Sequence, residues 1–299
     1  MTRQETDRNE HATPPIFVSH GSPMTALQPG AAGAFWRQLG TAIDQGFGRP
    51  SAIIAISAHS LGRQPALLAA ARHHTVHDFS GFPQALYELR YDAPGAPELA
   101  PTVAKHLAAA GIDLQISPEG GLDHGIWTPL RFAWPDADVP VLPLVFPPDW
   151  SPQRLMALGR ALAPLASKGV LMVGTGSITH NLQMVYSRGG LPPLDAPELA
   201  ESASFRQWMR DRSAAGDWPA LQQYRQLAPH AVLMHPTDEH LLPWFVAAGA
   251  GDPASPGLRL HSSLTYGCLG MDGYAFGPSA ARLASVLAES AQSGLDAPA

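Results

Sequence analysis

Two kinds of residue are scarce in this sequence: charged side chains and cysteine. Charged residues make up 15% of the 299 residues, against a typical share of roughly 25%, while hydrophobic residues make up 45%. A chain with this apolar share is neither disordered nor fibrous, because it can bury an extensive core. The only cysteine, Cys268, excludes an internal disulfide framework and any zinc site built from several cysteines.

Basic side chains are also in deficit. The 19 Lys and Arg residues stand against 25 Asp and Glu residues, which gives a net charge of −6. This balance argues against nucleic acid or an anionic membrane as the main partner. No stretch has the roughly 18–20 apolar residues that span a membrane, and residues 1–13 lack the apolar segment of a secretory signal. We therefore expect a cytoplasmic protein with no nucleic-acid partner and no membrane, and the sequence leaves open whether it forms a homo-oligomer.

Short apolar runs alternate with segments of helical spacing along the chain. Such alternation, with continuous apolar strands, is typical of an α/β fold. It predicts a three-layer α/β/α sandwich with a mainly parallel, mixed central sheet. Strands are predicted at 16–18, 52–56, 139–146, 170–173 and within 258–269, and helices at 34–46, 98–110, 152–163, 197–212 and 237–248.

The sequence also predicts the position of one strand in the sheet and the limits of the domain. Pro140 and Pro143 lie within the strand predicted at 139–146, and because proline cannot donate to a ladder, that strand is expected near an edge. We expect one domain over 14–290, between a flexible N-terminal tail at 1–13 and a C-terminal tail at 291–299.

Histidine is the residue type that carries a functional signal. The chain has 13 histidines, and three of them, His20, His59 and His180, follow the ends of predicted strands among small residues. Ligands bind at the carboxyl ends of the strands in open α/β sheets, so we expect these side chains to converge. A fourth, His240, falls in the first turn of the last predicted helix, with Thr237 as the helix cap.

Neutral imidazoles that meet in a polar pocket bind borderline divalent metals, and both Fe(II) and Zn(II) accept them. A single histidine at a strand end is more often a hydrogen-bonded structural residue. Three strand-end histidines together with one in the first turn of a capped helix predict a metal site. The chain has no HExxH and no CxxC motif, so the spacing selects no known zinc motif.

Other residues are candidates for acid–base catalysis and for contact with a ligand. His124 stands beside an aspartate in a glycine-flanked loop, which suits either a general acid or base or an ordinary turn. A polar pair precedes two aromatic residues at 77–82, which suits an aromatic ligand but also a packed loop. The candidate substrate contacts are His77, Asp78, Phe79, Phe82, Trp127 and His235.

Six segments carry a family resemblance, and they run in the expected order from about residue 15 to 277. They are SHGSPM (19–24), SAHS (57–60), HDFSGFPQALYELRYDAPG (77–95), GLDHGIWTPL (121–130), GTGSITHNL (174–182) and HPTDEHLLP (235–243). Together they resemble the class III extradiol ring-cleavage dioxygenases, and most closely the 4,5-DOPA dioxygenase extradiol branch. HDFSGFP, LDHGIW and THNL are specific in combination.

The resemblance implies a role for each histidine. His20, His59 and His240 look like metal ligands, and His180 is either an added ligand or the acid/base group. His124 looks like a second active-site histidine that faces substrate or oxygen. The resemblance also implies one divalent metal, with Fe(II) required for activity. Zn(II) is expected to occupy the site in a purified sample and to give an inactive form, because zinc has no redox chemistry.

The implied reaction is extradiol cleavage of a catechol by dioxygen to a muconic-semialdehyde-type product. His180 is expected to take a hydroxyl proton from the catechol, while Phe79, Phe82 and Trp127 wall its ring. Two alternatives stay open. A zinc-dependent hydrolase would use the histidines to activate water, and a non-catalytic protein would bind metal or catechol without turnover.

Overall fold

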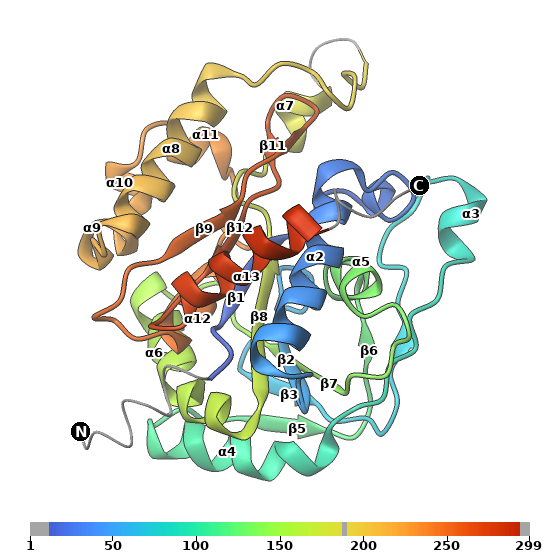
Figure 1. Ribbon diagram of the computed structural model, residues 1–299, viewed down its shortest axis with the longest axis vertical. Helices are drawn as coiled ribbons and strands as arrows, with labels where there is room; N and C mark the ends of the chain where they lie inside the picture. Colours follow the sequence, from blue (N-terminus) through green and yellow to red (C-terminus); the bar gives the residue numbers. More distant parts are fainter. Residues whose placement is uncertain (1–11, 187–189, 294–299) are drawn as a thin grey trace.

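The computed structural model describes residues 12–186 and 190–293. Its centre is an eight-stranded sheet with the strand order β5-β3-β7-β2-β8-β1-β12-β9 (Figure 1). The strands of this sheet are β1 (Ile16–Ser19), β2 (Ala52–Ser57), β3 (Ala66–Leu68), β5 (Gln115–Ser117), β7 (Val141–Val145), β8 (Val170–Gly176), β9 (Leu258–His261) and β12 (Gly273–Ala275).

Smaller strand pairs and helices surround this sheet. The pairs join β4 (His74–Thr75) to β6 (Gly121–Leu122) and β10 (Leu264–Thr265) to β11 (Leu269–Gly270). The α-helices are α2 (Gly30–Phe47), α3 (Gln84–Tyr87), α4 (Ala100–Ala109), α5 (His124–Ala133), α6 (Pro152–Leu162), α7 (Leu182–Tyr186), α8 (Ala200–Ala214), α9 (Trp218–Gln222), α10 (Tyr224–Leu227), α11 (Ala231–Met234), α12 (Leu242–Ala250) and α13 (Ala280–Ser293).

Burial in β2 shows why helices cover both faces of the sheet. Every residue of β2 and of β8 is buried, and strands that bury both faces need a layer on each side. Ile54 and Ile56 belong to a core that α4, α6 and α12 complete, whereas Ile53 and Ala55 belong to a second core with α2, α5 and α13. In Figure 1, α2 and α13 lie side by side in front of the sheet. The predicted three-layer α/β/α sandwich is confirmed.

The sheet is mixed, as predicted. Its centre, β7-β2-β8-β1, is parallel, while β12 and β9 add antiparallel strands on one side and β3 pairs antiparallel with β7 on the other. Parallel strands with crossover connections direct their carboxyl ends to the same side of the sheet. The ends of β1, β2 and β8 therefore meet.

The position predicted for the proline-containing strand is wrong. This strand is β7, and β3 and β5 lie between it and the edge of the sheet. β2 pairs with β7 from Val141 to Pro143, whereas β3 pairs only with Leu144 and Val145. The ladder with β3 thus ends before Pro143, so an interior strand accommodates a residue that has no N–H.

The start predicted for the helix at 237–248 is also wrong. α12 begins at Leu242, without a side-chain cap, so His240 lies in the turn that precedes the helix. The hydroxyl of Thr237 donates to Oε1 of Glu239 at 2.9 Å instead of capping the helix. Hydroxyl side chains near helix starts often form local hydrogen bonds of this kind, and such a bond takes the place of a helix cap.

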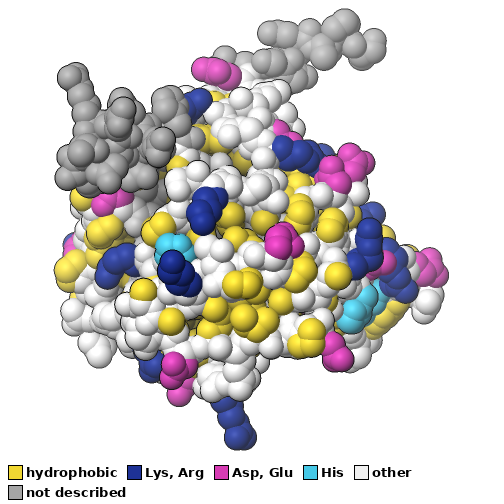
Figure 2. Space-filling model, turned by 90° about the horizontal axis from the view of Figure 1, so that it is seen from below, with side chains coloured by type: hydrophobic (Ala, Val, Ile, Leu, Met, Phe, Trp, Pro, Cys, Tyr) yellow, Lys and Arg dark blue, Asp and Glu magenta, His cyan; other side chains and the backbone are white. Residues whose placement is uncertain are grey.

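Three observations concern the termini and the surface. Residues 1–11 and 294–299 of the predicted tails lie outside the described residues, and α13 continues to Ser293. Within the described ranges, no helix is both long and apolar enough to cross a membrane. Figure 2 shows the molecule from below, where Lys and Arg side chains are spread among hydrophobic, acidic and uncharged ones. The described residues on that face therefore form no continuous basic surface of the kind that nucleic acid requires.

Candidate active site

Three neighbouring strand ends bring three histidines together. β2, β8 and β1 are adjacent and parallel, and His20, His59 and His180 follow β1, β2 and β8 in the chain. This arrangement is the crevice at strand carboxyl ends that open α/β sheets use for ligands. The predicted convergence of these three residues therefore follows from the topology of the sheet.

Two further histidines come from segments next to helices. His124 is the first residue of α5, and the side chain of Asp123 caps this helix by accepting from the backbone N–H of Ile126. His240 lies in the turn before α12, and its carbonyl accepts from the backbone N–H of Ser177 at 2.8 Å. That bond ties the turn directly to the end of β8.

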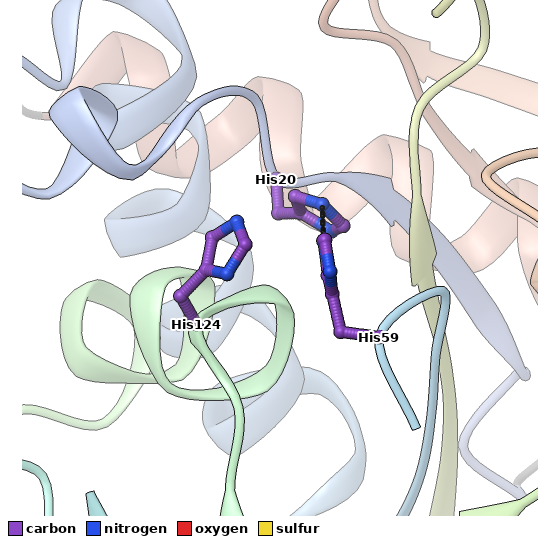
Figure 3. Close-up of side chains that lie close together, drawn as sticks. All are labelled: His20, His59 and His124. Carbon is purple, nitrogen blue, oxygen red and sulfur yellow. Dashed lines mark hydrogen bonds between the residues drawn. The ribbon is translucent and has the colours of Figure 1, made fainter. Parts of the chain in front are cut away.

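The five rings form one cluster. The ring centre of His20 lies 5.0 Å from that of His59, 5.3 Å from that of His124 and 5.6 Å from that of His240. His180 stacks on His240 with 3.5 Å between the ring centres. Figure 3 shows the rings of His20, His59 and His124 pointing toward one another from three separate segments. The histidines predicted from the sequence to form a site therefore lie close together in the structure.

The tautomer of His20 follows from a hydrogen count. Its Nδ1 lies 2.9 Å from Oγ1 of Thr175, and that hydroxyl donates to the carbonyl of Gly125 at 2.7 Å. A hydroxyl has one hydrogen to donate, so Nδ1 of His20 must carry the hydrogen that Thr175 accepts. Because burial and four neighbouring imidazoles hold the pKa of His20 well below 6.5, its ring is neutral and Nε2 carries a lone pair.

Asp78 serves two histidines at once. Its Oδ2 lies 2.9 Å from Nδ1 of His124 and 3.4 Å from Nδ1 of His59, and its Oδ1 accepts from the backbone N–H of His124. Burial acts to raise the pKa of Asp78, but the hydrogen bond and charge of His124 outweigh it and hold that pKa below its usual value. An ionised Asp78 favours hydrogen on both Nδ1 atoms, which leaves the Nε2 atoms of both rings as lone-pair donors.

Neither neutral tautomer of His59 satisfies both of its contacts. Its Nε2 lies 3.1 Å from Nε2 of His20, which carries a lone pair. With hydrogen on Nδ1, two lone pairs face each other. With hydrogen on Nε2, a lone pair faces the carboxylate of Asp78. A doubly protonated ring would resolve the conflict, but burial and the neighbouring His124 and His240 lower the pKa of His59 to about 3.

A metal cation resolves the same conflict at neutral pH. Histidine nitrogens lie about 2.0–2.1 Å from a bound zinc ion, so two such ligands at 90–110° are about 3.0–3.4 Å apart. The 3.1 Å between the two Nε2 atoms of His20 and His59 falls in that interval. The donor set present here therefore fits a divalent metal.

On the far side of the cluster, a carboxylate orients another histidine. Oε1 of Glu239 accepts from Nδ1 of His240 at 3.1 Å. Burial opposes ionisation, yet the hydrogen bond from His240 lowers the pKa of Glu239 to about 2. His180, stacked on His240, has its pKa lowered to about 2 by burial and by the neighbouring imidazoles. Burial also lowers the pKa of His240, so the rings of His180 and His240 are both neutral at physiological pH.

Two histidines compete for the place of a third ligand. Ligand nitrogens of His20, His59 and His124 all lie within 4.8 Å of one another, and His180, Glu239 and His240 form an adjacent group. Imidazole ring centres on one metal at 90–110° are about 4.5–5.3 Å apart. The ring centre of His59 lies 5.0 Å from that of His240 but only 4.1 Å from that of His124. The ring centre of His20 lies 5.3 Å from that of His124 and 5.6 Å from that of His240. His124 therefore fits the interval with His20, and His240 fits it with His59.

An aromatic group adjoins the histidine cluster. The ring of Phe79 stands edge-on to His124 at 5.6 Å and contacts Phe82 at 5.5 Å and Tyr87 at 5.3 Å. His77 lies 5.6 Å from Phe79 on the other side. Tyr87 was not among the predicted contacts, although it stands five residues after Phe82 in a short helix of the same segment. These rings form an apolar wall next to His124.

Two of the predicted substrate contacts lie deeper than the others. Trp127 is fully buried, and its Nε1–H donates to the carbonyl of Val76. His235 is also fully buried, with Nε2 on the carbonyl of Ile178 and its ring against Phe205. The structure brings Trp127 behind Phe79, at 6.5 Å between ring centres, and places His235 beneath the segment that leads to His180.

The chain matches a known protein family, several named relatives and a solved structure. The family model described as the catalytic LigB subunit of aromatic ring-opening dioxygenase matches residues 14–277. A 4,5-DOPA dioxygenase extradiol from Beta vulgaris is 35% identical over 266 residues, which cover 87% of this chain and 95% of that protein. A protein of the same name from Escherichia coli is 34% identical and covers 81% of this chain and 87% of its own length. The crystal structure of an uncharacterized protein from Escherichia coli K12 superposes with a TM-score of 0.69 at 26% identity, covering 88% of this chain and 99% of that one.

Proposed function

The chain belongs to the family of the catalytic LigB subunit of aromatic ring-opening dioxygenases, and we propose that it opens the ring of a catechol of the DOPA type. As an extradiol ring-cleavage dioxygenase, it acts on a small aromatic molecule together with O₂. In the proposed reaction the ring bond beside the diol breaks. Both oxygen atoms enter a muconic-semialdehyde-type product, so no further reductant is needed.

His20, His59 and His240 hold the metal in this proposal. The single observation that carries it is the pair of facing Nε2 atoms of His20 and His59, whose separation of 3.1 Å is that of two imidazole ligands on one metal. Glu239 supports the assignment because it accepts from Nδ1 of His240 and so directs Nε2 of that ring to the metal. The carboxylate of Asp78 lies 3.4 Å from Nδ1 of His59 and favours hydrogen on that atom. A bound Fe(II) supplies binding for the two catechol oxygens and the redox chemistry that zinc lacks.

His180 acts as the base that receives a hydroxyl proton of the catechol. Its ring is neutral, as a proton acceptor must be, because burial keeps its pKa low. A catecholate oxygen beside the ring raises that pKa, since an opposite charge favours the protonated form. The proton thus moves to His180 only when the substrate that releases it is in place.

His124 and Phe79 orient the substrate. Asp78 fixes His124 with its Nε2 toward the space shared with His20 and His59. Phe79 stands perpendicular to His124, with 5.6 Å between the ring centres, and in this proposal it packs against the aromatic ring of the substrate. A catechol held against Phe79 has its hydroxyls on the side of the histidines.

Oxygen uptake tests the proposal. Protein loaded anaerobically with Fe(II) is mixed with L-DOPA and a panel of small catechols, and a zinc-loaded sample and a His59→Ala variant serve as controls. We expect uptake with a yellow semialdehyde product from the iron-loaded protein alone. Confirmed iron at the site without uptake on any catechol would overturn the substrate class. Oxygen-independent hydrolysis by the zinc form would favour a hydrolase.

A further inference from the structure

Thr175 joins three elements of the site at one hydroxyl group. It lies in β8, is 1% exposed, and contacts both the ring of His20 after β1 and the carbonyl of Gly125 in α5. His124 and His240 use the carboxylates of Asp78 and Glu239 as acceptors, and His59 lies 3.4 Å from the carboxylate of Asp78. His20 instead uses a neutral hydroxyl, whose own hydrogen is committed elsewhere.

That commitment makes Thr175 an obligate acceptor toward His20. A free hydroxyl can rotate and donate, and it would then accept either tautomer of a neighbouring imidazole. Here the carbonyl of Gly125 can only accept, so the hydroxyl hydrogen points to it at 2.7 Å. The lone pairs of Oγ1 are therefore the only groups that this side chain offers to Nδ1 of His20.

Without this hydroxyl, His20 has a competing arrangement. Hydrogen on its Nε2 could be donated to Nε2 of His59, 3.1 Å away. That tautomer places a hydrogen where a metal must bind. The energetic preference that excludes it comes from the bond to Thr175.

We propose that Thr175 is a positioning residue that holds His20 as the Nδ1–H tautomer, with Nε2 bare and ready to bind the metal. This inference rests on the proposed metal site, but the tautomer itself is a property of the metal-free chain. Partners that orient metal-bound histidines typically contribute about 10–100-fold to metal affinity. Loss of the hydroxyl is expected to cost an amount in that range.

The first readout is the tautomer of His20 in metal-free protein. Long-range ¹H–¹⁵N correlation spectra of histidine-labelled protein distinguish the two tautomers, and a His20→Gln variant assigns the signals. We expect Nδ1–H in the wild type and in Thr175→Ser, and a shift toward Nε2–H in Thr175→Val, which has nearly the same shape. Nε2–H in the wild type would overturn the inference without reference to any variant.

The second readout is metal affinity, measured by chelator competition with Zn(II). We expect Thr175→Val to bind about 10–100-fold more weakly than the wild type and Thr175→Ser to stay within about threefold. Thr179→Val is a matched control, because Thr179 is also buried and its hydroxyl also accepts one bond and donates one, to backbone groups of Gly270 and Cys268. It is expected to keep the tautomer of His20.

The two readouts separate the inference from the proposed function. A wild type that binds metal, with Thr175→Val equal to it in affinity and tautomer, would overturn the role of Thr175. A wild type that binds no metal but shows Nδ1–H at His20, with the shift in Thr175→Val, would support the role of Thr175 and contradict the metal site.

Discussion

The Nε2 atoms of His20 and His59 face each other across 3.1 Å, and the partners of the two Nδ1 atoms give both a lone pair. Thr175 accepts from Nδ1 of His20, and the carboxylate of Asp78, 3.4 Å from Nδ1 of His59, favours hydrogen on that atom. Two lone pairs at this distance in a partly buried contact repel, so the metal-free site holds an unfavourable contact that a cation removes. Sites built in this way keep local strain that the rest of the fold must support.

Metal binding should therefore stabilise the folded protein markedly. A ligand that binds only the folded state at 100 times its Kd adds about 2.7 kcal/mol of unfolding free energy. For a domain of this size, with an unfolding entropy of about 2.1 cal/mol/K per residue, that corresponds to a rise in Tm of roughly 4–5 °C. Thermal unfolding with and without Zn(II) measures the rise, and His59→Ala should show little of it. An equal rise in wild type and variant would place the metal elsewhere.

The third ligand can be identified by comparing three variants. We expect His240→Ala to lose at least 100-fold in metal affinity, because it removes an imidazole that Glu239 orients. His124→Ala should retain affinity within about tenfold while turnover falls. His180→Ala should suppress turnover by about 10²–10⁴-fold with a much smaller change in affinity. Chelator competition and oxygen uptake are measured on each variant. Loss of metal in His124→Ala but not in His240→Ala would make His124 the third ligand in place of His240.

The sequence predicts the architecture because its strands are continuous apolar runs. β2 and β8 are recognisable from residues alone, and their burial on both faces dictates helices on each side. The histidines after β1, β2 and β8 are likewise predictable, since parallel topology places strand ends together. The sheet order was less accessible: Pro143 marks the end of the ladder with β3 and not the edge of the sheet.

Contacts between distant segments lie beyond such reasoning. No local pattern indicates that Thr175 accepts from a ring 155 positions away, or that Asp78 serves both His59 and His124. These partnerships depend on side-chain directions that only tertiary packing sets. The resemblance supplied the roles of the histidines, but the acceptors behind them required the structure.

The metal-free protein should lose stability as the pH falls below 6.5. Burial lowers the pKa of His180 to about 2, of His59 to about 3 and of His235 to about 4, whereas each is near 6.5 in the unfolded chain. Between those values the unfolded state binds more protons, so this stability is fully present above pH 6.5 and declines toward the folded pKa values. The three histidines together remove about 4 kcal/mol at pH 5.5 relative to pH 7.

Urea unfolding of chelator-treated protein at pH 7.0 and 5.5 measures this dependence. His235→Asn supplies the comparison, because it removes one of the three groups and should reduce the pH dependence by about 1 kcal/mol. Equal urea midpoints at the two pH values in the wild type would contradict the assignment of these rings as neutral.

The aromatic wall should affect substrate binding more than the chemical step. Replacing Phe79 by Ala removes the ring that stands edge-on to His124. We expect KM for a catechol to rise about two- to tenfold, since such ring contacts contribute about 0.5–1.5 kcal/mol. Phe82→Ala is the matched control, because Phe82 contacts Phe79 at 5.5 Å, and its effect on KM should be smaller. Steady-state oxygen uptake separates kcat from KM. A fall in kcat with an unchanged KM would assign Phe79 a different role.

Gly125 should also be important to the metal site, for steric reasons. A Cβ at this position would lie 2.6 Å from Oγ of Ser57 and 2.9 Å from Nδ1 of His20, so Gly125→Ala must displace the ring of a ligand that Thr175 holds in place. We expect metal affinity to fall at least tenfold, together with a lower Tm. Gly40→Ala separates these two effects, because its Cβ would lie 2.2 Å from the carbonyl oxygen of Ala133 in a helix contact away from the histidines. That variant should lower Tm and leave metal affinity unchanged. If chelator competition gave Gly125→Ala the affinity of the wild type, His20 would have to bind the metal from another position than the one described.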